Sequence, residues 1–141
     1  MKLVVLCLFA VCCCSLANTT NSRKKLEEVL RQLRDVKTSL QNDDKMLNTP
    51  PENIENCCSL KALECFRANL KLHFNINEKK QSKLYRSLTH TLTVNGLDFC
   101  NSGNKTLPCQ HCDSHPKAPA QEFFNRLESL IQRGITRLTM N

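Results

Sequence analysis

At 141 residues the chain has room for one domain, and 20 basic against 13 acidic side chains give it a net charge of +7. This charge favours acidic partners, either an acidic protein surface or, more weakly, sulfated glycans, although high solubility alone would also explain it. With one Tyr and no Trp, the chain lacks the aromatic rings that stack on bases, so we expect no nucleic-acid partner.

The N-terminus has the three parts of a secretory signal peptide. A basic start is followed by an apolar run at residues 3–14 and by small residues in Ser15-Leu16-Ala17, where cleavage is expected after Ala17. A membrane anchor is the alternative, but 12 apolar residues are too few to cross a bilayer core of about 30 Å. We therefore predict a signal peptide at residues 1–17 and a secreted, extracellular domain at residues 18–141 without membrane insertion.

The spacing of apolar residues predicts a first helix from about Ser22 to Asn42. Three- and four-residue steps place its apolar side chains on one stripe: Leu26, Val29, Leu30, Leu33, Val36 and Leu40. Asn21 or Ser22 can cap the start of this helix, and Thr49-Pro50-Pro51 prevents any continuation.

A second helix is predicted from about Asn56 to His73, with an apolar side formed by Leu60, Leu63, Phe66, Leu70 and Phe74. A third is predicted from about Asn77 to Thr93, with Asn95-Gly96 as its stop. Its apolar residues recur at four-residue steps: Leu84, Leu88 and Leu92. The run of Leu, Thr and Val near its end is also compatible with a strand.

The C-terminal part of the chain consists of a predicted loop, from Asn95 to Ala118, and a last helix. Pro119 suits the first turn of that helix, and its apolar stripe continues to the C-terminus: Phe123, Phe124, Leu127, Leu130, Ile131, Ile135 and Leu138. Gly134 lies in this stripe, where glycine lowers helix propensity by about 1 kcal/mol but permits close packing. Four amphipathic helices without a convincing strand pattern indicate an all-α fold, a four-helix bundle.

Six of the ten cysteines lie beyond the signal peptide: Cys57, Cys58, Cys65, Cys100, Cys109 and Cys112. An even number in a small exported chain indicates disulfide bonds, because the compartment oxidises thiols. A bridge across about 50 residues would stabilise the fold by roughly 4 kcal/mol through the entropy of the unfolded chain. Asn18 and Asn104 begin Asn-x-Ser/Thr triplets and are candidate glycosylation sites, although such triplets also occur by chance.

The cysteine pattern resembles that of the short-chain four-helix cytokines, the family that contains interleukin-2, interleukin-15 and interleukin-21. The similarity is carried by CSLKALECF at residues 58–66 and by CQHCDS at residues 109–114. In the last helix, EF at residues 122–123 and LIQRGI at residues 130–135 are also similar to the family. The resemblance covers nearly the whole domain and is strongest in the second and fourth helices.

This resemblance implies an up-up-down-down bundle in which Cys58 pairs with Cys109 and Cys65 pairs with Cys112. The remaining two cysteines, Cys57 and Cys100, are then predicted to pair with each other. Because Cys57 and Cys58 are adjacent, they could exchange roles.

The resemblance further implies a monomeric cytokine that bridges a private receptor and a shared gamma chain, and so triggers kinase-coupled signalling in lymphocytes. The gamma-chain positions of the family fall on Gln132 and Ile135. Helical geometry places Ile135 at the edge of the apolar stripe beside an exposed Gln132, which suits a small binding patch. The alternative is a partly buried isoleucine beside an idle glutamine.

The private receptor would bind the first and third helices. Lys25 and Arg86 match basic positions of the family, and the exposed faces of the two helices add Glu28, Arg31 and Lys83. Charge complementarity at such positions governs the choice of partner and the rate of encounter. The alternative is a solvated charged face that binds nothing.

The same residues are compatible with other functions. Cys109-x-x-Cys112 with His111 and His115 could hold zinc or act in redox chemistry, but an oxidising compartment favours disulfides. No Ser or Cys stands in a recognisable frame of His and carboxylate, so we expect no enzyme, no metal and no cofactor. A cationic host-defence peptide that acts on membranes is the rival, since basic residues crowd the first helix: Arg23, Lys24, Lys25, Arg31, Arg34 and Lys37.

Overall fold

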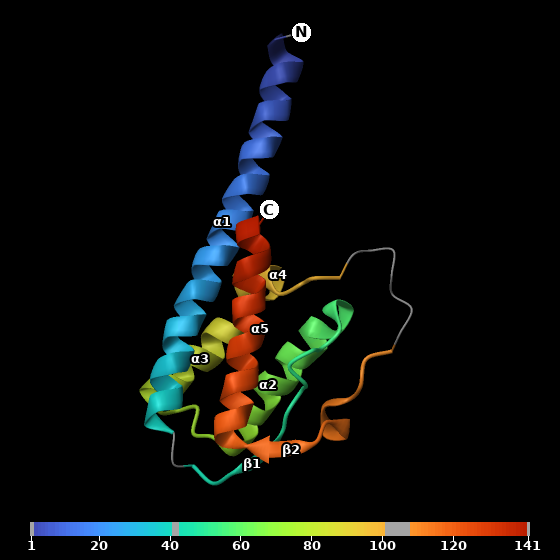
Figure 1. The fold of residues 1–141 in the computed structure, drawn as a ribbon. Coiled ribbons are helices and arrows are strands. Elements are labelled where there is room, and N and C mark those ends of the chain that lie inside the picture. Colours follow the sequence, from blue (N-terminus) through green and yellow to red (C-terminus); the bar gives the residue numbers. More distant parts are fainter. Residues whose placement is uncertain (1, 41–42, 101–107, 141) are drawn as a thin grey trace.

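The computed structural model describes residues 2–40, 43–100 and 108–140 (Figure 1). In chain order the elements are α1 (Lys2–Ser39), β1 (Met46–Asn48), the 3-10 turn η1 (Asn56–Cys58), α2 (Ser59–His73), α3 (Lys79–Thr89), α4 (Thr91–Gly96), the 3-10 turn η2 (Cys112–Ser114), β2 (Lys117–Pro119) and α5 (Ala120–Met140). This part of the chain is therefore mostly helical, with several helices packed together and three disulfides.

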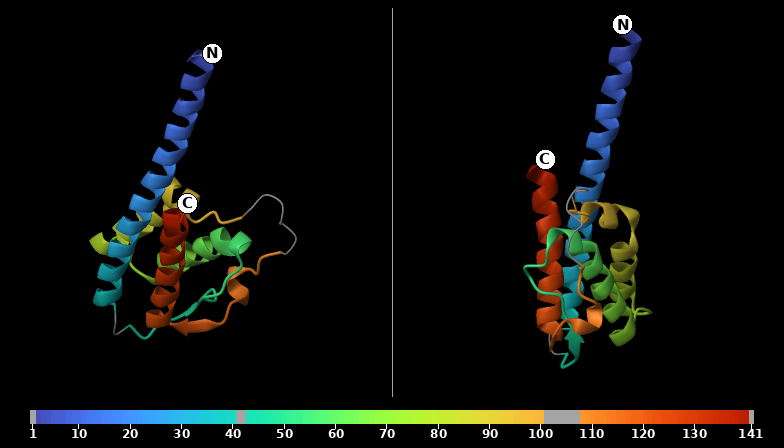
Figure 2. Two further views of the ribbon diagram at one scale, coloured as in Figure 1. Left: turned by 45° about the horizontal axis from the view of Figure 1, so that its top comes forward. Right: turned by 90° about the vertical axis from the view of Figure 1, so that its right-hand side faces the viewer.

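Helix α1 begins earlier than predicted. It continues from Lys2 to Ser39 without a cap at Asn21 or Ser22, because residues 2–21 contain no Gly or Pro that would interrupt a helix. The N-terminal part of α1, which includes the predicted signal peptide, projects beyond the end of α5 and away from the other elements (Figures 1 and 2). Cleavage after Ala17 stays a prediction. Among the described residues, no helix has the length and apolar composition needed to cross a membrane.

The helices surround one core. Helices α1 and α2 each contact both α3 and α5, so α3 and α5 lie at opposite corners of the helical body (Figure 2). Three aromatic rings cross the centre, where the ring centroid of Phe123 lies 5.2 Å from that of Phe66 and 5.3 Å from that of Phe124. Burial of each such side chain contributes about 1.5–3 kcal/mol, which makes this core the main stabilising feature of the fold.

The predicted apolar stripes are confirmed. The buried members on α1 are Leu26, Val29, Leu33 and Val36, and those on α2 are Leu63, Phe66 and Leu70. Those on α3 are Leu84 and Leu88, and those on α5 are Phe123, Phe124, Leu127, Leu130 and Ile131. Phe74, directly after α2, is also buried, and the remaining members are half-buried, for example Leu30, Ile135 and Leu138 at the margin of the core.

The third predicted helix is in fact two helices, and the prediction of one continuous helix was wrong. His90 separates α3 from α4 in an extended conformation, with ψ at 141°. Its Nδ1 accepts a hydrogen bond from the backbone N–H of Leu92 (3.1 Å), and the Thr93 hydroxyl donates to the Ser87 carbonyl (2.6 Å). These side-chain bonds replace the backbone bonds that the break removes. The alternative of a strand here is also wrong, since the segment is helical.

A short antiparallel ribbon, which the sequence did not predict, joins the two long connections. Strand β1 pairs with β2 so that Leu47 lies opposite Ala118. Leu47 is fully buried and fastens its connection to the core. Pro119 ends β2 directly before α5, instead of lying in the first turn of the helix as predicted. The region predicted as a loop from Asn95 to Ala118 thus includes part of this ribbon and η2.

Two buried glycines mark the closest approach of α5 to its neighbours. A Cβ at Gly134 would lie 2.7 Å from Cδ2 of Leu97 and 2.8 Å from Cδ1 of Leu26. Gly134 therefore permits the close packing that its place in the apolar stripe suggested. Gly96 ends α4 with a negative φ, so it is not the left-handed glycine stop that was expected.

Candidate binding surfaces

Three disulfides fasten α2 and the turn before it to the connection that leads toward α5. They join Cys57 to Cys100, Cys58 to Cys109 and Cys65 to Cys112, with Cα–Cα distances of 4.2, 5.5 and 5.2 Å. These are the predicted pairs, and Cys58 is the member of the adjacent pair that bonds to Cys109. The zinc and redox alternatives lose their thiols, because both sulfurs of Cys109-x-x-Cys112 are bonded to other cysteines.

A buried polar seam lies against the third bridge. Asn69 donates from Nδ2 to the carbonyl oxygen of Cys65 (2.9 Å), and the same nitrogen lies 3.1 Å from Sγ of Cys112. Asn48 of β1 donates to the carbonyl oxygen of His115 (2.8 Å). Burial lowers the pKa of His115 and so favours its neutral form. The seam joins the ribbon, α2 and the disulfide-bonded connection into one unit.

The two predicted gamma-chain residues lie on the outer side of α5. Gln132 is exposed, whereas Ile135 is half-buried and packs against the core. Ser129 and Thr136 lie on the same side, since residues three and four apart share one face of a helix. We call these four residues the α5 surface. These four residues carry no charge and include one apolar side chain, Ile135, at the edge; Glu128, four residues before Gln132, lies on the same side but is ion-paired with α1.

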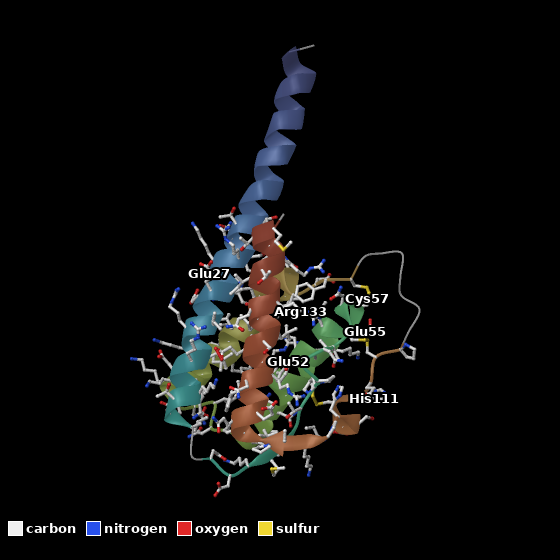
Figure 3. The ribbon with its side chains drawn as sticks, viewed as in Figure 1. Glu27, Glu52, Glu55, Cys57, His111 and Arg133 are labelled. Carbon is white, nitrogen blue, oxygen red and sulfur yellow. A yellow bond between two sulfur atoms is a disulfide. The ribbon has the colours of Figure 1, made fainter. Side chains whose placement is uncertain are left out.

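Arg133, which the sequence patterns did not single out, fastens α5 to the segment before α2. Its Nη2 donates to the carbonyl oxygen of Ile54 (2.9 Å) and lies 3.2 Å from both Asn56 Oδ1 and Ser59 Oγ. In Figure 3, Arg133 lies on the side of α5 that faces Cys57. This clamp fixes the rotation of α5 and hence the direction in which its neighbour Gln132 points.

Cation–π contacts add to these hydrogen bonds of Arg133. The guanidinium of Arg133 lies 5.2 Å from the ring centre of Phe99, and that of Arg137 lies 4.8 Å from the same ring. Cation–π contacts of this kind contribute about 0.5–1 kcal/mol at partly exposed sites. One turn earlier on α5, the Ser129 hydroxyl donates to the Glu52 carboxylate (3.2 Å). Helix α5 is therefore held against the segment of residues 52–59.

The predicted private-receptor residues are divided between two neighbouring helices. On α1, Lys25 forms an ion pair with Glu28 (3.4 Å), and Glu28 accepts a hydrogen bond from Gln32 (3.3 Å). Further along α1, a groove of about 320 Å³ opens toward α3. We call it the α1–α3 groove, and its lining residues are Gln32, Asp35, Lys79, Lys80 and Lys83. Lys83 of α3 therefore lines the same groove as Gln32 of α1, and Gln32 is bonded to Glu28.

Two predicted residues stand apart from this groove. Arg31 and Arg86 are exposed, and neither forms an ion pair within the part of the chain that the structure describes. Asp35, Lys79 and Lys80 of the groove were not predicted from the sequence, although their helical spacing from Gln32 and Lys83 is a usable signal. Of the two candidate glycosylation sites, Asn104 and the side chain of Asn18 lie outside the described residues.

Helices α1 and α5 are joined by a charged contact. Glu128 of α5 accepts hydrogen bonds from Arg34 Nε (3.1 Å) and Lys37 Nζ (3.2 Å). Partial burial acts to raise the pKa of Glu128, but the hydrogen bonds and charges of the two basic side chains outweigh it and lower the pKa. This contact joins the polar margins of α1 and α5, whose apolar faces belong to the same core.

A comparison of the sequence with protein-family models finds no match. The functional assignment therefore rests on the residues and on their arrangement.

Proposed function

We propose that this protein is a secreted, monomeric cytokine similar to interleukin-21, with the up-up-down-down topology of short-chain four-helix cytokines. The sulfur pairing supports the proposal most, since the pairs Cys58–Cys109 and Cys65–Cys112 were implied by the family resemblance and both are present. Within the family, Asp113 and Ser114 after the last cysteine, together with Pro119 before the final helix, favour interleukin-21 over interleukin-15. An interleukin-15-like or interleukin-2-like cytokine is the near alternative.

The arrangement of the surfaces supports a bridging role. The α5 surface lies on α5, whereas Lys83 and Arg86 lie on α3, at the opposite corner of the body (Figure 2). Helix α1 lies between these two helices and contacts both. A protein with two separated surfaces can hold two receptors at once without a clash between them. In this proposal Gln132 and Ile135 bind the shared gamma chain. The private receptor contacts α1 and α3 through Lys25, Glu28, Arg31, Lys83 and Arg86.

The action of such a protein is non-covalent. Binding of two receptor ectodomains to one cytokine raises the local concentration of their cytoplasmic tails and of the kinases bound to them. At the α5 surface, Ile135 supplies an apolar anchor and Gln132 a hydrogen-bonding group, the combination found at the centre of small interfaces. At α3, Lys83 and Arg86 attract an acidic receptor surface and speed its encounter.

The rival function, a host-defence peptide, requires α1 to insert its apolar face into a membrane. In the structure that face is buried, because Leu26, Leu33 and Val36 are fully enclosed by the other helices. Exposing it would require the disulfide-linked body to open. The folded protein therefore favours receptor binding.

Kinase phosphorylation in lymphocytes tests the proposal. We expect Gln132→Asp and Lys83→Glu each to reduce the potency of the oxidised, processed protein by at least about tenfold. Gln121→Asp is the matched control, since Gln121 is an exposed glutamine on α5 outside the α5 surface, and it should leave the potency unchanged. No phosphorylation by the wild type, or leakage of liposomes at similar concentrations, would refute the proposal and support the rival.

A further inference from the structure

We infer that the α1–α3 groove binds a sulfated glycan through Lys79, Lys80 and Lys83, a site that does not depend on the proposed receptor function. All three lysines are exposed. None of them forms an ion pair with any residue that the structure describes. By contrast, four other lysines each lie within 3.8 Å of a carboxylate oxygen: Lys25, Lys37, Lys45 and Lys61.

The position of these lysines on α3 is unfavourable for stability. They occupy the first two turns of the helix, where the positive end of the helix dipole lies and where cations are destabilising. The first turn holds no acidic residue, and the N-cap residue Glu78 uses its carboxylate to accept a hydrogen bond from the backbone N–H of Gln81 (3.3 Å). Folding therefore does not explain the cluster, whereas an anionic ligand gains from both the lysines and the dipole.

The three lysines are arranged along the groove. Lys79 and Lys83 are one helical turn apart, with a rise of about 6 Å between them, so their charges follow the groove. Such a row of cations suits a linear polyanion.

The surroundings argue against other anionic partners. Insertion into an anionic membrane would require exposed apolar side chains beside the lysines, but Leu84 and Leu88 of α3 are fully buried. The proposed receptor contact uses only Lys83 of this groove, whereas the row of three lysines matches the repeated sulfate groups of a glycan.

Binding to immobilised heparin tests the site with a double variant, Lys79→Ala with Lys80→Ala, which leaves the proposed receptor residue Lys83 unchanged. We expect heparin affinity to fall about tenfold or more and its salt dependence to become weaker. The matched control is Lys24→Ala with Lys117→Ala, two exposed lysines on α1 and β2 whose loss lowers the net charge equally. This control should retain nearly full affinity.

A gain of binding provides the second test. Asp35 is the one carboxylate that lines the groove, so Asp35→Asn should strengthen heparin binding, which a damaged fold could not do. Equal losses in the two lysine doubles would show attraction by net charge alone and overturn the site. Binding to vesicles rich in phosphatidylserine as tight as to heparin would overturn the assignment to a glycan. Loss of signalling with heparin binding intact would affect only the proposed receptor function.

Discussion

Replacing Gly134 by alanine should destabilise the protein, although alanine is the better helix former. In an open helix the change would stabilise by about 1 kcal/mol. Here the added methyl carbon would lie 2.7 Å from Leu97 Cδ2 and 2.8 Å from Leu26 Cδ1, both below the normal contact distance. The sign of the effect therefore depends on whether these two side chains can move.

The packing around Gly134 leaves little room for such movement. Leu26 and Leu97 are both fully buried, and the carbonyl oxygen of Gly96 would lie 3.3 Å from the new carbon on a third side. Overpacking of a close-packed core costs about 1–3 kcal/mol. With the gain in propensity subtracted, we expect a net loss of about 1 kcal/mol in the free energy of unfolding.

Urea unfolding of the oxidised, processed protein, followed by circular dichroism, measures this difference. The control is the same substitution in a Leu97→Ala background, where one of the two close contacts is removed while that with Leu26 remains, so Gly134→Ala should cost clearly less stability there. If Gly134→Ala alone raised the free energy of unfolding by about 1 kcal/mol, the reasoning would be refuted, because the neighbouring side chains would then be able to move without cost.

Three further predictions concern stability. Removal of the Cys58–Cys109 bridge by Cys58→Ala with Cys109→Ala should lower the free energy of unfolding in urea by about 3 kcal/mol. This is less than the roughly 4 kcal/mol of an isolated loop, because Cys57–Cys100 already closes most of that loop. An unchanged urea midpoint would contradict this prediction. Arg133→Met keeps the side-chain length but removes the hydrogen bonds to Ile54, Asn56 and Ser59, and should lower the free energy of unfolding by about 2 kcal/mol. Arg137 does not make these bonds, so the control Arg137→Met should cost clearly less. Glu128→Gln should lower the free energy of unfolding by roughly 0.5–1 kcal/mol at neutral pH. The pKa of Glu128 is lowered in the folded state, so the stabilisation by the Glu128 ion pairs is complete above the ordinary carboxyl pKa of 4.5. It is lost as the pH falls through the folded pKa. Wild type and Gln variant should then converge in acid, and a constant difference between them would exclude the ion pair as its cause.

The sequence predicted the features that depend on local periodicity and on chemistry of one residue type. Apolar spacing identified the stripes of α1, α2 and α5 because a buried helix face requires an apolar residue every three or four positions. The pairs Cys58–Cys109 and Cys65–Cys112 were implied by the family resemblance, and Cys57–Cys100 was predicted because these two cysteines remained. The half-buried Ile135 beside an exposed Gln132 followed from helical geometry alone.

The features that were missed depend on contacts between distant segments. The break at His90 is stabilised by two side-chain bonds whose residues look ordinary in a helical pattern. The ribbon between β1 and β2 is too short to show an alternating pattern. In the sequence alone Arg133 cannot be told from a solvated cation, because its partner Ile54 lies far away in the chain. Such contacts become visible only when the chain is folded.

The affinity of the oxidised, processed protein for a purified gamma-chain ectodomain tests the central claim most directly. We predict binding that Gln132→Asp and Ile135→Asp each weaken by at least about tenfold, while Gln121→Asp keeps it within about twofold. Circular dichroism identical to wild type would show that the variants are folded. No binding by the wild type, or undiminished binding by the two folded α5-surface variants, would contradict the account.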